Sequence, residues 1–419
     1  MVTHDERRYF RCSARLTPLV LATVTLAAAC CKIPEKPPSL VDQIDTAMRR
    51  GATFLLRQQS FDGAWRSEVY GAFKRGDALT PLALRALIAI PAQSTPGTAQ
   101  VEHAIQRGSD ALAAWAPGEE DAPGPPLFAV YTAAQSIEVL SHSSDPEDLA
   151  AREAWTAELA GRQLTEALGW SAEEAFFGGW GYSAAVPRKP PPGALQPPLL
   201  EANISATVFA LQGLRAGGMP ADGRACRQAL LFLEGLQNFV EGGGPWEPLE
   251  DGGFHFIAED PVRNKAGVAG TDVAGRIRFR SYGSATADGL RGLLLCGLPA
   301  SHPRVQAAVA WLTANWSASE HPGAFAPRLA ADRDGLYYYW AASAAQALAL
   351  AGSDRVLFWH FQPKPWADSL ATELIRRQGT DGSWINPVVT MREDEPNIAT
   401  SMALLALAEV RRVIDSPEP

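Results

Sequence analysis

The stretch RRQGTDGSW at residues 376–384 repeats the plan of LLRQQSFDGAW at residues 55–65. In both, an amphipathic segment ends in a glutamine, an Asp-Gly pair favours a tight turn, and a tryptophan adds a large apolar surface and an N–H that needs a partner. The shared pattern is Gln-x-x-x-Gly-x-Trp, formed by Gln59, Gly63 and Trp65 and again by Gln378, Gly382 and Trp384. The two stretches therefore predict the unit of an internal repeat.

Apolar segments recur with the pattern Thr-x-x-x-Leu-x-x-Leu, whose spacing places the three side chains on one helical face. The clear copies are Thr80, Leu84 and Leu87; Thr207, Leu211 and Leu214; Thr286, Leu290 and Leu293; and Thr400, Leu404 and Leu407. Two weaker copies lie near residues 128–140 and 337–350, and a more amphipathic segment precedes each apolar one. The chain is therefore predicted to form six helix pairs.

The apolar helices must be buried, because a helix that is apolar on almost every side needs a cover, which an amphipathic helix provides. The predicted fold is therefore all-α, a single closed α/α toroid of six hairpins over residues 41–415 with inner helices ringed by outer ones. An open helical solenoid would stack the same hairpins. Closure is favoured because both ends of the chain carry a turn repeat and neither shows a polar capping repeat.

Several motifs resemble the terpene cyclase and protein prenyltransferase superfamily, in particular the squalene–hopene cyclase and prenyltransferase repeats. They are the two Gln-x-x-x-Gly-x-Trp turns, Asp-Gly-Gly-Phe at residues 251–254, LYYYWA at residues 336–341 and the Ala-Thr starts of the inner helices. The resemblance covers roughly residues 41–410 and implies the α/α-toroid fold. It implies much less about chemistry, since one fold serves many functions.

The N-terminus predicts export. Residues 1–29 place four arginines before an apolar run that is too short to span a bilayer and ends in small residues. The following Cys30 resembles the lipidated cysteine of a bacterial lipobox, although the leucine lies one position further away than usual. RRYF at residues 7–10 also resembles a twin-arginine signal, but a plain basic segment is the favoured interpretation. Residues 30–40 would then form a stiff, Pro-rich tether to a membrane in the cell envelope.

The charge balance excludes one class of partner. The formal net charge is −9, and removal of residues 1–29 takes away four basic and two acidic residues, so the mature chain carries −11. Proteins that bind nucleic acid neutralise phosphates with a surplus of Lys and Arg. Nucleic acid is therefore not an expected partner.

The motif that supplies the acid in squalene-type cyclisation is missing. In the family, Asp-x-Asp-Asp lies just before the Thr of an inner helix, whereas this chain has YGSA before Thr286 and PNIA before Thr400. The nearest acids are EDE at residues 393–395, which come slightly too early. Asp394 is a candidate acid, although a charged turn or helix cap is the favoured interpretation of these residues.

A second candidate acid is Asp288, two residues after Thr286. Leu82, Phe209 and Met402 occupy the matching position of the other clear repeats. If the Thr/Leu/Leu stripe packs on the outer helices, this position faces the centre of the ring. A lone carboxylate in an otherwise apolar lining would have a raised pKa and could act as an acid. Alternatively, Asp288 pairs with Arg291 on the helix surface. Both interpretations are open.

The predicted ligand cavity is lined by apolar and aromatic side chains, which suit an isoprenoid or acyl chain. Its expected members are Leu82, Phe209, Tyr282, Tyr338 and Met402.

A metal site and a cofactor are not expected. Prenyltransferases hold zinc with an Asp, a nearby Cys and a distant His, and the sequence has no Asp-x-Cys. His255 and His360 lie among aromatic residues, where packing explains them better than metal binding.

The irregular stretch at residues 239–280 is divided by charge, with acids first and bases after them. One interpretation is a basic rim formed by Lys265, Arg278 and Arg280, which would receive an anionic head group such as a diphosphate. The favoured interpretation is that the two halves pair with each other across solvent.

Two functions from different classes fit these observations. The favoured one is an exported toroid without catalytic activity that binds an apolar, isoprenoid-like molecule or a protein of the cell envelope. The alternative is a terpenoid cyclase-type enzyme that uses Asp288 or Asp394 as general acid. A weaker third function, action on a polysaccharide, would need paired carboxylates across a cleft.

Overall fold

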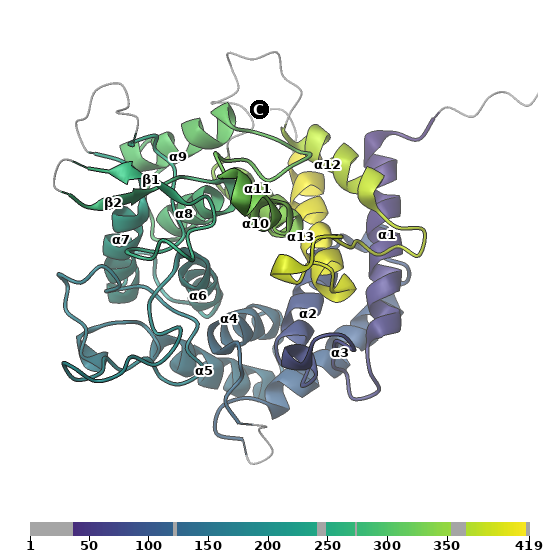
Figure 1. Ribbon diagram of the computed structural model, residues 1–419. Coiled ribbons are helices and arrows are strands. Elements are labelled where there is room, and N and C mark those ends of the chain that lie inside the picture. Colours follow the sequence, from purple (N-terminus) through teal and green to yellow (C-terminus); the bar gives the residue numbers. More distant parts are fainter. Residues whose placement is uncertain (1–36, 120–123, 241–248, 273–274, 353–365, 416–419) are drawn as a thin grey trace, which may run out of the picture. The chain divides into compact units, whose positions relative to one another are not determined.

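Two kinds of helix alternate along the chain (Figure 1). The amphipathic outer helices are α1 (Leu40–Gln58), α3 (Thr98–Ala114), α5 (Pro146–Ala160), α7 (Arg224–Leu236), α9 (Pro303–Ala314) and α12 (Trp366–Arg377). The inner helices, buried on nearly all sides, are α2 (Leu79–Ala89), α4 (Ala129–Leu140), α6 (Ile204–Ala216), α8 (Gly283–Leu295), α11 (Tyr337–Leu350) and α13 (Pro396–Asp415). A short helix, α10 (Ala330–Asp334), precedes α11.

The structure is a computed structural model that describes residues 37–119, 124–240, 249–272, 275–352 and 366–415. The predicted export signal at residues 1–29, the lipidation candidate Cys30 and most of the tether at residues 30–40 lie outside these ranges. The described residues from Pro38 onward belong to one structural unit. No helix within the described ranges combines enough length with enough apolarity to cross a membrane.

The inner helices close into a ring. Each inner helix packs against the next along the chain, and α13 packs against α2 (Figure 1). The outer helices surround them, and α1 contacts both α12 and α13, so the first and last helices meet. The predicted all-α class and the α/α-toroid fold are thereby confirmed. The sequence did not predict the small antiparallel ribbon of β1 (Val268–Thr271) and β2 (Ile277–Phe279) within the irregular stretch.

One repeated hydrogen bond fixes the turn before each of four inner helices. The side-chain oxygen of the repeat Thr accepts a bond from the backbone N–H of an aromatic residue in the preceding turn. The distance is 3.0 Å for Trp65 to Thr80, Trp180 to Thr207, Phe254 to Thr286 and Trp384 to Thr400. The recurrence of Thr in the apolar pattern therefore has a structural cause.

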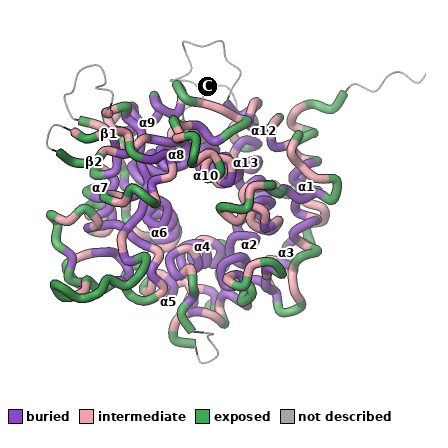
Figure 2. Tube along the Cα trace, in the orientation of Figure 1, coloured by how far each residue is buried: buried purple, intermediate pink, exposed green. Residues whose placement is uncertain are grey.

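The tryptophans of these turns also bind the outer helices. The indole N–H of Trp65 donates to the Leu55 carbonyl at 2.8 Å, and that of Trp384 donates to Leu374 at 2.7 Å. Both tryptophans are fully buried, and Figure 2 shows that most residues of the inner helices are buried as well. Each repeat tryptophan thus joins its turn to the end of its own outer helix and satisfies its N–H inside the core.

A glutamine amide joins one repeat to the next at four junctions among the described residues. Gln378 donates to the Gly382 carbonyl of its own turn and to the Ala47 carbonyl of α1, both at 2.9 Å. This pair of bonds connects the last repeat to the first and closes the outer layer. The same pair is made by Gln59 to Gly63 and Ala104, Gln163 to Gly178 and Ala225, and Gln237 to Gly252 and Arg304.

Gly382 is required where the last turn meets α1. Its φ of +95° is a left-handed conformation, and an added Cβ would lie 2.5 Å from the Arg50 carbonyl oxygen. A side chain at this position would therefore be strained by its own backbone and would also collide with the first helix.

Candidate functional site

Side chains from five inner helices meet at Phe209 of α6 in the centre of the ring. The Tyr131 ring of α4 lies 4.8 Å from the Phe209 ring, and the Tyr339 ring of α11 stacks on it at 6.4 Å. The guanidinium groups of Arg85 on α2 and Arg291 on α8 lie 5.7 and 6.0 Å from the same ring. Because α2 and α11 do not neighbour α6 in the ring order, these contacts reach across its interior.

Two buried ion pairs belong to this Phe209 cluster. Arg85 pairs with Glu138 of α4 at 3.0 Å, and Arg291 pairs with Asp288 at 3.3 Å. Gln212 joins the two pairs, since it donates to Glu138 at 2.8 Å and accepts a hydrogen bond from Arg291. The four charges balance, so the centre of the ring is strongly polar and formally neutral.

The expectation of an otherwise apolar lining around Asp288 is therefore wrong. Arg85 and Arg291 both lie five residues after the repeat threonine, where α6 carries Gln212. Positions two and five residues after the same Thr lie on one helical face, so both point to the centre. Comparing the residues five positions after each repeat Thr would have revealed the positive charges of Arg85 and Arg291 in the ring interior.

The Asp288 carboxylate is 1% exposed and accepts hydrogen bonds at both oxygens. Tyr339 Oη donates to Oδ2 at 2.7 Å, whereas Ser343 Oγ and Arg291 donate to Oδ1 at 2.8 and 3.3 Å. Burial raises the pKa of Asp288, and Arg291 and the two hydroxyl groups oppose that rise. Asp288 therefore combines both sequence interpretations, because it lies in the ring interior and pairs with Arg291 there.

A chain of hydroxyl groups leads away from Asp288. Tyr339 Oη is hydrogen-bonded to Ser205 Oγ, Ser205 to Tyr131 Oη at 2.8 Å, and Tyr131 to Tyr182 Oη at 2.9 Å. Burial raises the pKa of Tyr182 to about 12 and raises the pKa values of Tyr131 and Tyr339 well above the ordinary range. The three phenols therefore stay protonated near neutral pH, and their O–H groups form a continuous chain of donors that ends at the Asp288 carboxylate.

The acids at residues 393–395 serve as caps and hydrogen-bond acceptors. Glu393 accepts from the backbone N–H groups of Tyr338 and Tyr339 at 3.0 and 2.7 Å, and so caps α11. Asp394 accepts from Tyr70 Oη at 2.7 Å, and Glu395 accepts from a serine hydroxyl. These contacts favour the cap interpretation of the acidic turn.

The Glu393→Gln substitution is expected to change how stability depends on pH. Burial raises the pKa of Glu393 from 4.5 to about 7. Its neutral form is therefore favoured in the folded state, and that stability is lost as the pH rises from 4.5 through 7. Relative to Glu393→Gln, the wild type should lose roughly 3 kcal/mol of unfolding free energy across this range. Urea unfolding at several pH values measures it.

The exposed Glu153 on α5 provides a matched control. Glu153→Gln removes an exposed carboxyl and gives the reference for the general effect of a Glu-to-Gln substitution. If Glu393→Gln behaves in the same way as Glu153→Gln, the Glu393 carboxyl does not titrate with an elevated pKa.

The other predicted cavity residues fall into two groups. Leu82 and Met402 occupy the positions of α2 and α13 that match Phe209 and Asp288, and Met402 is partly buried. Tyr282 packs against His321 and Phe325, each with ring centroids 5.6 Å away. Tyr338 packs edge-on against its neighbour Tyr337 at 5.1 Å. The structure thus places Leu82 and Met402 at the ring positions of the Phe209 cluster, and Tyr282 and Tyr338 in separate aromatic contacts.

The bases of the predicted anion rim are held by different partners. Lys265 lies 5.8 Å from the Phe256 ring, and Arg280 donates to a backbone carbonyl. Arg278 lies 3.8 Å from Asp272. Asp272 also binds Arg276 at 2.9 Å, so charge pairing within the stretch is partly local. The acids at residues 241 and 247 lie outside the described residues.

No metal centre is found among the described residues, where no group of three or more His, Cys, Asp and Glu side chains is arranged to hold an ion. His255 is buried beside Phe279 at 5.4 Å, and this burial lowers its pKa to about 3. It is therefore a neutral packing residue. The other histidine considered, His360, lies outside the described residues.

Comparison with known proteins identifies solved structures that have a similar fold. No family model and no curated protein matches the chain. A variant of the type II terpene cyclase MstE from Scytonema, in complex with merosterolic acid A, matches at 14% identity with a TM-score of 0.54, covering 89% of this chain and 99% of the cyclase. The cellobiose 2-epimerase from Spirochaeta thermophila matches at 14% identity with a TM-score of 0.51, covering 89% and 98%.

A third structure is described as a possible member of the GH105 family from Salmonella enterica. It matches at 14% identity with a TM-score of 0.50, covering 95% of this chain and 99% of that one. At these identities the likeness concerns the fold. The resemblance inferred from the sequence motifs is therefore confirmed as a shared, terpene-cyclase-like α/α toroid.

Proposed function

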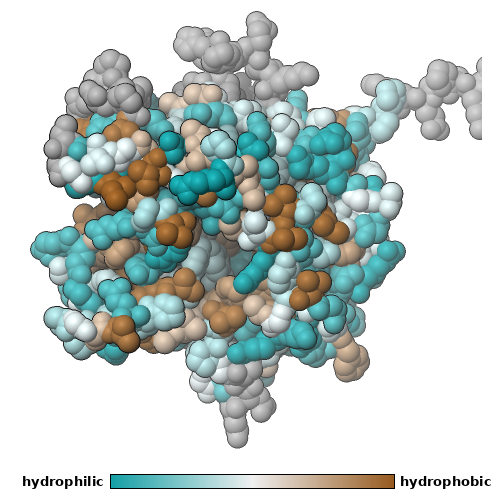
Figure 3. Space-filling model, in the orientation of Figure 1, coloured by the Kyte–Doolittle hydropathy of each residue, from teal (hydrophilic) through white to brown (hydrophobic). Residues whose placement is uncertain are grey.

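We propose that the protein binds a small, largely apolar molecule at the centre of its ring. The observation that carries the proposal is the convergence of five inner helices on Phe209. Figure 3 shows the molecule in the orientation of Figure 1, with a hollow in the middle of this face. Tyr131, Gln212, Tyr339 and Met402 lie on inner helices and are nevertheless only partly buried. Their exposed surface inside a ring of buried helices is what a ligand would cover.

The composition of the centre indicates the ligand's chemistry. Leu82 and Met402 offer apolar contacts from the neighbouring helices α2 and α13. Tyr131, Tyr339 and Gln212 offer hydrogen-bonding groups from the other side. Because the charges of the Phe209 cluster are already paired, a neutral ligand fits best. An isoprenoid-like molecule with a hydroxyl or carbonyl group at one end has these properties.

The cellular setting is part of the same proposal. The export signal at residues 1–29 and lipidated Cys30 would anchor a six-hairpin toroid, residues 41–415, in the cell envelope through the tether at residues 30–40. The apolar molecule would then come from a membrane. A protein of the cell envelope is the other proposed partner, and the bases Lys265, Arg278 and Arg280 would contact its anionic groups.

The alternative is a terpenoid cyclase-type enzyme with Asp288 as general acid. The raised pKa of Asp288 and the terpene-cyclase-like fold favour it. Three observations oppose it: the missing Asp-x-Asp-Asp, the 1% exposure of Asp288 and the donors that occupy both of its oxygens. In the binding function, Asp288 instead holds Tyr339 in place. A donor also occupies the carboxylate of Asp394, which accepts a hydrogen bond from Tyr70, and this opposes a role of Asp394 as the acid.

Replacing Phe209 with alanine should reduce ligand occupancy about tenfold or more, since a central aromatic anchor is lost. The full-length protein is purified from its host's membranes and studied by native mass spectrometry, followed by lipid extraction. Phe61→Ala is the matched control, because Phe61 is fully exposed on the first repeat turn. Equal occupancy in Phe209→Ala and Phe61→Ala would contradict binding at the ring centre. Turnover of the extracted lipid that Asp288→Asn abolishes would support the enzyme instead.

A further inference from the structure

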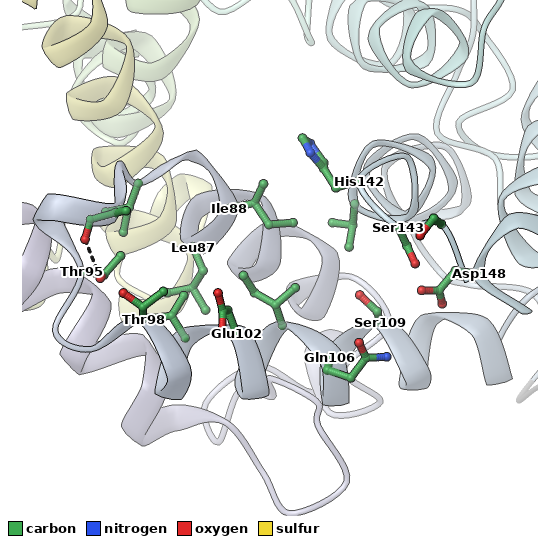
Figure 4. Close-up of a pocket in the computed structure, with 16 residues that line it drawn as sticks. Leu87, Ile88, Thr95, Thr98, Glu102, Gln106, Ser109, His142, Ser143 and Asp148 are labelled. Atoms are coloured by element: carbon green, nitrogen blue, oxygen red, sulfur yellow. Dashed lines mark hydrogen bonds between the residues drawn. The ribbon is translucent and has the colours of Figure 1, made fainter. Parts of the chain in front are cut away.

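A cavity of about 510 Å³ is lined by α2, α3, α4, α5 and the segments that join them (Figure 4). It shares no residue with the Phe209 cluster. Leu87 and Val139, near the C-terminal ends of α2 and α4, form apolar wall together with Ile105 of α3. Cavities of roughly 300–1,000 Å³ suit ligands of drug size. This one is large enough for a small organic molecule.

A buried carboxylate lies at one end of the cavity. Asp148, in the first turn of α5, is only 4% exposed, yet no hydrogen bond or ion pair to its side chain is found in the described part of the chain. Helix capping does not explain it, since Asp145 already accepts the bond from the Glu147 N–H at 2.8 Å. Its oxygens are not among the fully buried side-chain atoms that lack a partner, so the carboxylate is accessible from the cavity. The position of Asp148 therefore calls for a ligand that donates.

The neighbours of Asp148 are hydrogen-bond acceptors that suit a cation. Figure 4 shows Ser109 and Ser143 beside Asp148, with Glu102 further along the wall formed by α3. Among the described residues that line the cavity, Glu102 and Asp148 are the acids, none is Lys or Arg, and His142 is the one other side chain that can carry a charge. Two negative charges in a partly enclosed cavity attract positive charge and repel anions.

We propose that this cavity binds a small organic amine. Its ammonium group would donate to the Asp148 carboxylate and to the hydroxyl oxygens of Ser109 and Ser143, which together match three N–H donors. Its apolar body would lie against Ile105 and Val139. This site is separate from the ring centre, so its test does not depend on the ligand proposed there.

Titration calorimetry on the purified full-length protein with three probes tests the charge preference. Phenethylamine is the cation, 2-phenylethanol the neutral analogue and 3-phenylpropionate the anion. The amine should bind at least about tenfold more tightly than either analogue, because only the amine forms a charge-assisted bond to Asp148. Binding of the alcohol as tight as that of the amine, or no binding of the amine up to millimolar concentrations, would overturn the proposal.

Variants locate the site. Asp148→Asn should weaken amine binding about tenfold and leave the weak binding of the alcohol unchanged. Glu147→Gln is the matched control, because it removes a neighbouring exposed charge from the same helical turn. Glu102→Gln, also at an exposed position, gives a second measurement that does not depend on folding of the Asp148 variant, and should weaken the amine about threefold. Amine affinity unchanged in both Asp148→Asn and Glu102→Gln would place the amine elsewhere.

Discussion

The Gly382→Ala substitution is expected to lower the free energy of unfolding by about 4 kcal/mol. Alanine costs energy at the left-handed φ of +95°, and its Cβ would lie 2.5 Å from the Arg50 carbonyl oxygen. The turn would have to move away from α1, which would also weaken the bonds that Gln378 makes to Gly382 and Ala47. The midpoint of urea unfolding, followed by circular dichroism, measures the change.

Gly193 provides the control that separates the two causes. It has a φ of +82°, but no atom lies within 4 Å of where its Cβ would be. Gly193→Ala should therefore show the backbone strain alone, about 1 kcal/mol. If Gly382→Ala costs no more than Gly193→Ala, the contact between the last turn and the first helix does not help to hold the ring closed.

The Arg291→Met substitution is expected to lower the free energy of unfolding by about 3–5 kcal/mol, because it leaves Asp288 buried without its ion-pair partner. Burial raises the pKa of Asp288, and loss of Arg291 would raise it further. Protonation would then relieve the unpaired charge, so the loss of stability should be largest near neutral pH and smaller in acid. Urea unfolding at neutral and acidic pH measures both effects.

Two further variants test this explanation. Arg291→Met combined with Asp288→Asn removes both charges and keeps an acceptor for Tyr339, so it should recover most of the loss. Arg224→Met breaks an exposed pair, with side chains 72% and 57% exposed, and should change the free energy by less than about 1 kcal/mol. A double variant no more stable than Arg291→Met would mean that methionine packs badly at this position.

The fold was predictable because its repeat is short and local. Gln59 and Gln378 lie four residues before their turn glycines, a spacing that is easy to see in the sequence. Gln163 and Gln237 make the same bonds to glycines 15 residues away, and these inserted residues hid two copies of the glutamine–glycine turn pattern. The β1–β2 ribbon was missed for a related reason, since it lies within an irregular insertion that the repeat does not govern.

The candidate site was predictable only in part. The repeat alignment identified the positions of Asp288 and Phe209, because each has a fixed offset from its Thr. It did not identify the partner of Arg85, since Glu138 belongs to the neighbouring helix α4, which lacks the clear Thr pattern. Which residues meet in the centre depends on how the helices are arranged in space, and periodicity within one helix carries no information about that.

The bonds of Gln378 to Ala47, and the ion pair of Arg411 with Asp45 at 2.8 Å, join residues that are more than 300 positions apart. The first described helix, α1, is therefore made long before the partners that close the ring. Part of its apolar face, which includes Ile44, Met48 and Leu55, stays uncovered until α12 and α13 are made. Ring closure is thus a late event with a large entropic cost. A chain truncated before α12 would keep exposed apolar surface at both ends of the open ring, and such surface promotes aggregation.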